Sequence, residues 1–213
     1  DASPGATWTS TNTLVAVVGS SSGMLRGVGA GIDTIIYKIN PGGCTAMFIV
    51  TVNPLPTGIF GTDHVCVGQS APESGVPAGG TWSATPTTIG IVDVVGMVTG
   101  VSAGTVKICY TLGTGCALCK DVTVDPLPAP IVGPDTVCVT NTIHLTDATP
   151  GGTWFSSDMT YVTIDTLGNA TGVAPNPTGV RVDYIYGNCS VSIIITVNPY
   201  PFPIHGPVGV CIG

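Results

Sequence analysis

The sequence predicts an all-β protein made of tandem β-sandwiches, and three observations support this fold class. Tryptophan and two series of cysteines recur, the cysteines at steps of 72 and then 73 residues. Such a period indicates repeated small units. Glycine (30) and proline (18) interrupt short runs rich in Val, Ile and Thr, which is typical of strands between tight turns. No stretch has the 3.6-residue apolar period of a long helix. The repeated positions are Trp8, Trp82 and Trp154; Cys44, Cys116 and Cys189; and Cys66, Cys138 and Cys211.

Two complete units and one incomplete unit follow one another along the chain. Residues 54–125 contain an opening strand around VCV, followed by GTWSA, IGIVDVV, GMVTGV, GTVKICYTL and CALCKDVTV. Residues 126–198 repeat this series, beginning with TVCV and ending with CSVSIIITV. Residues 1–53 contain only the later elements, from ATWTSTN to CTAMFIVTV. Short strands at this spacing predict antiparallel sandwiches.

Residues 199–213 read as the opening of a further unit. The tail NPYPFPIHGPVGVCIG matches NPLPTGIFGTDHVCVG and DPLPAPIVGPDTVCVT, and a whole unit follows each of those two segments. The start DASPGATW matches the interior segment DATPGGTW. We therefore expect the first unit to lack its first strand. A donor strand from a neighbouring copy or repeat would complete it, formed by Val210, Cys211 and Ile212.

This offset has two interpretations, which the sequence leaves open. Discrete subunits could exchange strands head to tail and form a homopolymer, or the sequence could be a window of a continuous tandem array. Both produce a string of similar sandwiches. Proline-rich joints between the units, such as Pro54-Leu-Pro56, predict semi-rigid spacers and hence a rod.

The repeated segments resemble a known family. The run from Trp82 through GMVTGVSAGTVKI, with its counterpart from Trp154 through GNATGV, is similar to the bacterial immunoglobulin-like group 2 repeats. This resemblance implies immunoglobulin-like sandwiches in secreted bacterial surface proteins. It implies no catalytic residues, because the family has no common ones.

Charge and hydropathy exclude several partners and locations. The net charge is −7 and only five residues are basic, so we expect no nucleic-acid surface. The longest apolar run, near residues 193–197, is too short to cross a bilayer, so we expect no membrane insertion. Eight cysteines without a second C-x-x-C or a His pair favour disulfides over a metal site. Disulfides place the protein in an oxidising, extracellular compartment.

Strand parity suggests which cysteines can bond. Side chains alternate between the two faces of a strand, and closing a hairpin over residues 113–115 sets Cys109 opposite Cys119 on the outer face. The same parity turns Cys116 toward the core. We therefore predict three disulfides within units and, from the two remaining cysteines, one between copies: Cys109–Cys119, Cys66–Cys116, Cys138–Cys189, and Cys211–Cys44 between copies. Lys120 falls on the core face, which a bulge or a snorkelling lysine would explain.

Few residues carry chemistry of other kinds. No motif for a catalytic site, a metal or a cofactor is present, and the chain has one glutamate, Glu73. Asp93 and Asp165 precede G-x-V/A-T-G turns, where an aspartate usually bonds the backbone. Three segments resemble the Asp-Ser/Thr-aliphatic acceptor of bacterial O-glycosylation, so modification is predicted at Thr34, Thr136 and Thr166.

These observations lead to a functional hypothesis and an alternative. We interpret the chain as a non-enzymatic structural subunit or repeat of an extracellular bacterial filament or adhesin stalk, whose main partner is itself. The alternative is a set of carbohydrate- or ligand-binding accessory domains of a larger secreted protein, with tryptophans stacking on surface glycans. Core packing is the competing explanation for the tryptophans.

Overall fold

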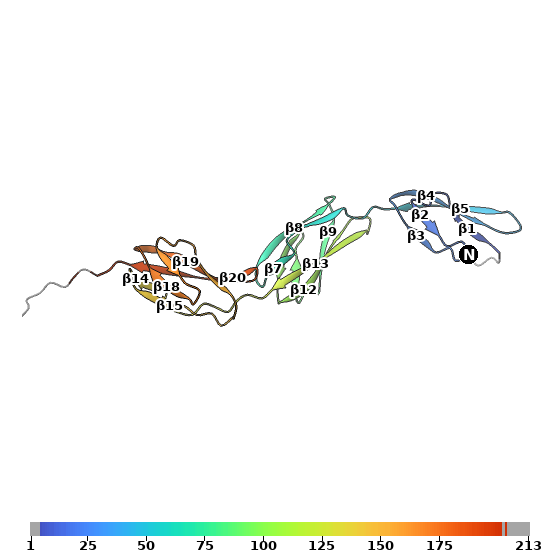
Figure 1. Cartoon of the computed structure of the whole chain (residues 1–213). Helices are drawn as coiled ribbons and strands as arrows, with labels where there is room; N and C mark the ends of the chain where they lie inside the picture. Colours follow the sequence, from blue (N-terminus) through green and yellow to red (C-terminus); the bar gives the residue numbers. More distant parts are fainter. Residues whose placement is uncertain (1–4, 202, 204–213) are drawn as a thin grey trace, which may run out of the picture.

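The computed structural model describes residues 5–201 and residue 203. These residues form β-strands and no α-helix, which confirms the predicted all-β class. The strands gather into three groups along an elongated chain (Figure 1), called here unit 1 (residues 5–53), unit 2 (residues 54–125) and unit 3 (residues 126–198). The described residues include no helix that could span a membrane.

Unit 2 is a sandwich of two four-stranded sheets. One sheet has the order β10-β11-β8-β6 and the other β7-β13-β12-β9. This order matches the ABED and CFG sheets of the immunoglobulin fold, with β7 added beside the last strand. All neighbours are antiparallel except β7 and β13, which are parallel. The strands are β6 (Gly58–Gly61), β7 (His64–Cys66), β8 (Ser70–Val76), β9 (Thr81–Thr85), β10 (Gly90–Val92), β11 (Met97–Gly100), β12 (Gly104–Thr111) and β13 (Ala117–Asp125).

The core of unit 2 lies between these two sheets. Val106 and Ile108 of β12 and Val122 and Val124 of β13 are almost fully buried, whereas the residues between them are more exposed. This alternation confirms the inner and outer faces predicted from parity. Val98 of β11 closes the core from the other sheet.

Unit 3 repeats the arrangement. Its sheets are β14-β20-β19-β16 and β15-β18-β17, and β14 again lies parallel to the last strand. An isolated bridge between Val132 and Thr146 stands where unit 2 has the β6–β8 pair. The strands are β14 (Thr136–Cys138), β15 (Thr142–His144), β16 (Thr153–Ser156), β17 (Val162–Ile164), β18 (Asn169–Gly172), β19 (Asn176–Tyr186) and β20 (Cys189–Asn198).

Unit 1 has fewer strands than the other two. Its described residues form a three-stranded sheet β1-β4-β5 and a two-stranded sheet β2-β3. These five strands correspond to β9 to β13 of unit 2, so the described part of unit 1 contains no counterpart of β6, β7 or β8. The gap is wider than the single missing strand that the sequence suggested. The strands are β1 (Thr7–Ser10), β2 (Ala16–Val18), β3 (Leu25–Gly27), β4 (Gly31–Lys38) and β5 (Thr45–Val52).

Each repeated tryptophan packs against a tyrosine of the neighbouring strand. The ring centroids are 4.6 Å apart for Trp82 and Tyr110, with similar pairs in units 1 and 3. The Tyr110 hydroxyl donates to the Pro77 carbonyl and accepts from the Gly80 N–H. Gly96, at φ 90°, passes under Trp82, where a Cβ would lie 2.9 Å from the indole nitrogen. The tryptophans therefore take part in core packing.

Lys120 stays on the core face because it forms a buried ion pair. Its Nζ lies 3.0 Å from Glu73 Oε2, and the Glu73 side chain is fully buried. The same Nζ donates to the Thr62 carbonyl at 3.1 Å. The β12–β13 register continues through this position without a bulge, so the alternative of a bulge is wrong. Unit 3 has an apolar pair, Ile193 and Leu145, at the two matching positions.

Replacing Lys120 alone should destabilise unit 2. In Lys120→Ile the Glu73 carboxylate stays buried without its partner, which costs about 3 kcal/mol of unfolding free energy. The double variant Lys120→Ile/Glu73→Leu, which copies unit 3, should recover most of that loss. Denaturant unfolding of the whole chain measures both. A double variant no more stable than the single one would contradict this account.

Candidate functional site

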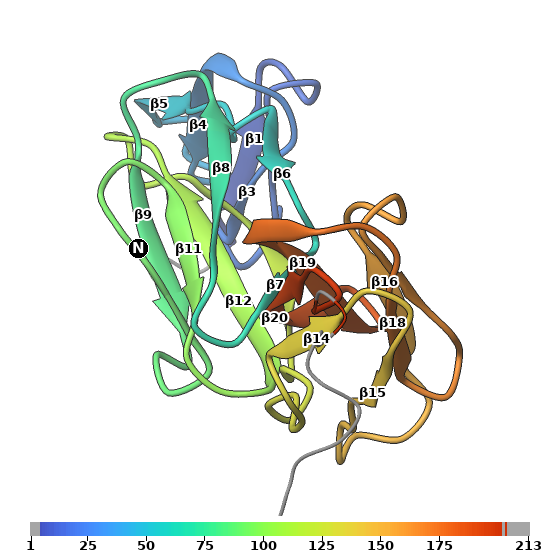
Figure 2. The same ribbon diagram turned by 90° about the vertical axis from the view of Figure 1, so that its left-hand side faces the viewer.

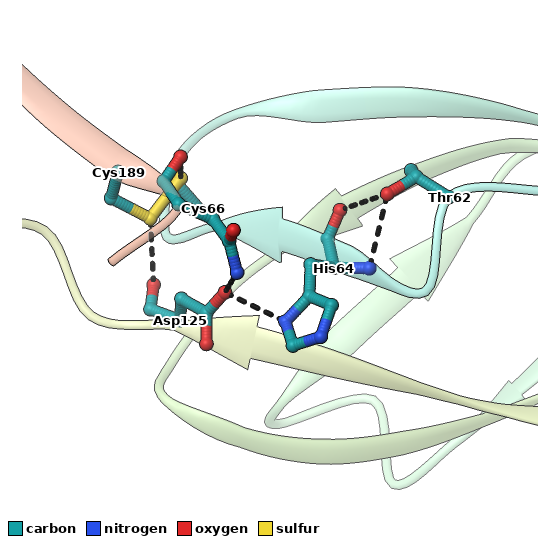
Figure 3. The surroundings of a disulfide bond; sticks show 6 residues. Thr62, His64, Cys66, Asp125 and Cys189 are labelled. Atoms are coloured by element: carbon teal, nitrogen blue, oxygen red, sulfur yellow. Dashed lines mark hydrogen bonds and ion pairs between the residues drawn. A yellow bond between two sulfur atoms is a disulfide. The ribbon is translucent and has the colours of Figure 1, made fainter. Parts of the chain in front are cut away.

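The joint between units 2 and 3 is held by a disulfide and by the opening strand of unit 2. Strand β7 runs parallel to the end of β13, which sets Cys66 beside Asp125. The Val67 N–H donates to the Asp125 carbonyl at 3.0 Å, which extends this pairing by one residue. Cys66 is bonded to Cys189, the first residue of β20 in unit 3 (Figure 3). The start of β20 therefore meets the end of β7 (Figure 1, Figure 2).

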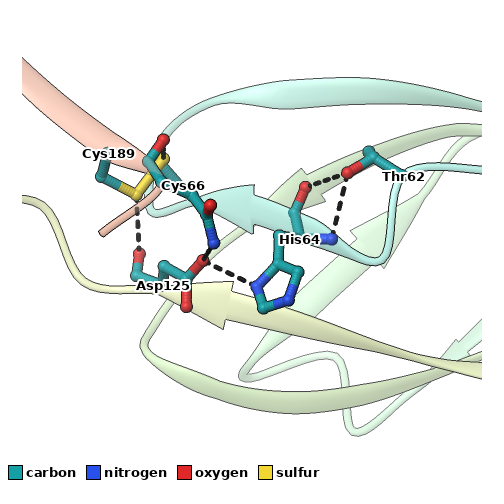
Figure 4. A network of polar contacts seen from close by, with 6 residues as sticks. Thr62, His64, Cys66, Asp125 and Cys189 are labelled. Carbon is teal, nitrogen blue, oxygen red and sulfur yellow. Dashed lines mark hydrogen bonds and ion pairs between the residues drawn. A yellow bond between two sulfur atoms is a disulfide. The ribbon is translucent and has the colours of Figure 1, made fainter. Parts of the chain in front are cut away.

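Polar contacts surround this disulfide (Figure 4). The Asp125 carboxylate accepts from the Asn188 amide at 3.0 Å and lies 2.9 Å from His64 Nδ1. The Asn188 hydrogen bond is the main cause that lowers the pKa of Asp125; burial opposes it, and the His64 contact adds to the lowering. Asp125 thus ties unit 3 to unit 2 through its charged form.

Two predicted disulfides, Cys66–Cys116 and Cys138–Cys189, are wrong. Cys66 bonds to Cys189 instead, across the joint. Parity assigns a side chain to a face but does not say how far along the strand it lies. Cys116 precedes Asp125 by nine residues, and at 3.3 Å per residue this places it about 30 Å from Cys66. Cys189 precedes Asn198, the neighbour of Cys138, by the same nine residues.

Among the described residues, the other cysteines divide into one bonded pair and three thiols. Cys109 and Cys119 face each other across β12 and β13 and form the predicted disulfide. Cys44, Cys116 and Cys138 form no disulfide within the described residues. The predicted bond between Cys211 and Cys44 involves a residue outside the described ones. This prediction depends on the same pairing rule, which fails for units 2 and 3.

The core face of unit 1 is open where the other units are closed. Leu25 on β3 is 40% exposed, whereas Val98 and Ala170, its counterparts on β11 and β18, are 1% and 0% exposed. Phe48 on β5 is 63% exposed. Its counterpart Lys120 has a side chain only 17% exposed.

A pocket of about 200 Å³ lies beside Phe48, lined also by the rings of Trp8 and Tyr37. The pocket and the exposed side chains of Leu25 and Phe48 follow from the missing counterpart of β8. In unit 2, β8 pairs with Val98, and its Glu73 and Gly75 contact Lys120 and Tyr110.

The edge of β5 is likewise unpaired in the described structure. Its counterparts β13 and β20 are interior strands, each flanked by an antiparallel and a parallel neighbour. Among residues 5–201, β5 pairs with β4 alone. The predicted donor residues Val210, Cys211 and Ile212 lie outside the described residues, so their pairing stays a prediction.

The three predicted glycosylation sites occupy different environments. Thr136 and Thr166 are exposed, at the start of β14 and in the turn before β18. Thr34 is half-buried on β4, and its own N–H donates to the side chains of Thr11 and Asp33. The modification itself stays a prediction at all three threonines.

The aspartates that precede the repeated turns bond the backbone, as predicted. Asp93 Oδ1 accepts from the N–H groups of Val95 and Met97. Asp165 makes the equivalent bonds and also accepts from the Asn169 amide, and this side-chain bond is the main cause that lowers its pKa. In the part of the chain that the structure describes, no three His, Cys, Asp or Glu side chains gather as a metal site.

Comparison with known proteins yields structural likenesses only. No protein-family model matches the sequence, and no curated protein matches it either. Membership of the bacterial immunoglobulin-like group 2 family therefore stays a prediction. The matched structures include invasin, a bacterial integrin-binding protein (18% identity, 93% of this chain, 52% of that chain, TM-score 0.39). Others are domains 1–6 of the surface layer protein SbsC (15%, 95%, 35%, 0.31) and a C-terminal fragment of intimin in complex with a receptor domain (15%, 60%, 53%, 0.34).

The chain spans about a third to a half of the length of these structures. All of these identities are below 25% and all of these TM-scores are below 0.5. Likenesses of this degree carry no argument about function.

The joint should weaken in acid through Asp125. Because its folded pKa lies below the ordinary value near 3.9, its contribution is present at neutral pH and is lost as the pH falls through the folded pKa. Asp125→Asn should therefore lower stability by about 1 kcal/mol at pH 7. The difference from wild type should shrink as the pH falls below the ordinary pKa of an aspartate. Calorimetry across this pH range measures it.

Asp121→Asn is the matched control for this experiment. Asp121 pairs with Lys107 at 2.7 Å, but both side chains are more than half exposed, so the pair contributes little. A difference between Asp125→Asn and wild type that stays constant from pH 7 to pH 2 would contradict the role given to the Asp125 charge.

Proposed function

We propose that this chain is a non-enzymatic structural subunit of an extracellular bacterial filament or adhesin stalk, assembled head to tail by strand addition. The observation that carries the proposal is the open edge of β5 beside the uncovered core of unit 1. In units 2 and 3 the chain's own opening strand closes the same position. The occupant of the open edge is the tail of a second copy.

The acceptor is built to take a parallel strand. In units 2 and 3 the opening strand places an apolar side chain into the core, Val65 at 6% and Val137 at 4% exposure. Unit 1 offers a matching surface at the end of β5, where the half-buried Val52 corresponds to Val124 and Val197. An exposed apolar edge is a template for strand addition, because its N–H and C=O groups have no partners.

The donor is chosen by sequence correspondence. The tail from Asn198 repeats the segments that begin at Asn53 and Asp125, and these segments supply β7 and β14. Val210 then corresponds to Val65 and Val137 and fills the core position of unit 1.

Assembly would continue from copy to copy because the donor strand and the acceptor edge are different surfaces at different ends of the chain. A contact between unlike surfaces is head-to-tail, so each copy keeps one free donor and one free acceptor. Units 2 and 3, with the boundaries proposed at residues 54–125 and 126–198, act as spacers. The two disulfides support an oxidising location outside the cell. The packed tryptophans give little support to sugar binding by exposed rings.

Assembly can be tested under reducing conditions, where strand addition is the only link between copies. Wild-type chains should form long particles by light scattering and negative-stain microscopy. Val210→Asp, which would put a charge into the core of unit 1, should give single chains of 21.4 kDa. Gly209→Asp is the control, because position 209 corresponds to the exposed His64 and Thr136.

Two results would contradict the proposal. One is equal assembly of the Val210→Asp and wild-type chains, and the other is a wild-type chain that stays single. Material of high mass that survives both reduction and denaturation would replace discrete subunits by a continuous tandem array.

A further inference from the structure

We propose that the opening-strand cysteine of each unit bonds to the hairpin cysteine of the following unit, including across copies. Cys138 then bonds to Cys44 of the next copy, and Cys211 bonds to Cys116 of the next copy. This inference rests on the proposed head-to-tail assembly and assigns the covalent bonds of its joint. It replaces the single Cys211–Cys44 bond expected from the sequence.

The Cys66–Cys189 bond is the template for this rule. Cys66 stands beside Asp125, the last residue of β13, and Cys138 stands in the same register beside Asn198 of β20. The backbone bond that follows is also the same, since the Val67 and Val139 N–H groups each donate at 3.0 Å to the carbonyl of that partner residue. Cys138 thus stands at the end of unit 3 as Cys66 stands at the end of unit 2.

The hairpin cysteines occupy the facing position. Cys189 Sγ lies 3.8 Å from the carbonyl oxygen of Asp125, which ends unit 2. Cys116 Sγ lies 3.8 Å from the carbonyl oxygen of Asn53, the residue that ends unit 1. Cys116 therefore has the same position at the joint between units 1 and 2 as Cys189 has at the joint between units 2 and 3. In the described structure no cysteine lies beside Asn53 to bond with it.

Strand addition supplies that cysteine. A tail strand laid parallel to β5 in the register of β7 and β14 places Cys211 beside Asn53, because Cys211 corresponds to Cys66 and Cys138. Cys44 is the third hairpin cysteine and is exposed in the turn between β4 and β5. It lies at the end of unit 1 that faces away from unit 2, where a preceding copy's Cys138 would arrive.

A disulfide between Cys211 and the Cys44 of the unit that its strand completes is excluded by the distance between them. Cys44 precedes Asn53 by nine residues, so a Cys211 beside Asn53 lies about 30 Å from Cys44 of the same unit. A disulfide requires Cα atoms within about 7 Å. Strand addition in the register of units 2 and 3 therefore cannot make the Cys211–Cys44 bond.

Each joint between copies would then contain two disulfides. Cys138–Cys44 connects unit 3 to unit 1 of the next copy. Cys211–Cys116 connects the tail to unit 2 of that same next copy. Each bond joins two Sγ atoms with loss of two protons and two electrons, which pass to a disulfide oxidant that is reduced to two thiols. The tail is thereby fixed at both ends of unit 1, so the donor strand cannot slide out under load.

Tryptic peptides under non-reducing conditions can identify the bonds. After thiols are blocked and the protein is denatured, cleavage at the five basic residues isolates residues 121–181, which contain Cys138 as their single cysteine. Because Cys66–Cys189 joins residues 39–107 to residues 182–213 in any case, we expect one linked species of four peptides. In it, residues 121–181 are held through Cys138–Cys44 and residues 108–120 through Cys116–Cys211. Release of residues 121–181 or of residues 108–120 as an unlinked peptide would contradict the proposal.

Gel ladders of serine variants give a second, independent readout. On denaturing non-reducing gels, Cys44→Ser should keep the ladder, because Cys211–Cys116 still links the copies. The double variant Cys116→Ser/Cys138→Ser should collapse to single chains. Cys109→Ser/Cys119→Ser is the matched control and should keep the ladder, because its bond lies within unit 2.

The contrary outcomes separate this inference from the function on which it rests. A ladder lost in Cys44→Ser but kept in Cys116→Ser/Cys138→Ser would overturn the inference in favour of the Cys211–Cys44 bond. Long particles in which Cys138 and Cys116 carry the blocking group would overturn the inference and leave the filament standing. Single chains without a ladder and without long particles would overturn both.

Discussion

The parallel pairing of an opening strand with the last strand of a sandwich is the interaction on which the rest of this structure depends. In units 2 and 3 it converts the edges of β13 and β20 into interior strands and places Val65 and Val137 over the core. It also places Cys66 at the end of β13, and this position along the sandwich decides which cysteine it can bond. In unit 1 the described residues lack this strand, and the edge of β5 is left open. Closure, cross-linking and assembly thus share one physical basis.

A disulfide between two units has mechanical consequences that a disulfide within one unit does not have. A disulfide inside a sandwich protects that sandwich from unfolding but leaves the joint dependent on the linker. Cys66–Cys189 instead joins two sandwiches directly, and the contacts of Asp125 with Asn188 and His64 add polar bonds at the same point. Cys109–Cys119 in unit 2 follows the other pattern and closes its own hairpin.

Much of the fold could be predicted from the sequence, because strand and turn signals are local. The repeat period located the units, and parity separated Val106 and Ile108 from the outward Cys109. The Cys66–Cys189 bond could not be found in this way, since parity carries no information about position along a strand. The repeat itself held a usable signal. In each complete unit the hairpin cysteine stands at the start of the last strand, whereas the opening-strand cysteine pairs with the end of that strand, so the two cysteines of one unit lie nearly a strand length apart. The alternation of side chains places Lys120 on the core face, but its partner Glu73 lies on β8 of the opposite sheet, and no local sequence signal connects the two.

A cryo-electron microscopy reconstruction of the assembled particle tests the central claim most directly, because it shows what lies along β5. The account predicts a strand of a second copy, parallel to the end of β5, with an apolar side chain packed into the core beside Val52. An edge of β5 that faces solvent in the particle, or that pairs with β5 of another copy in a symmetric contact, would contradict it.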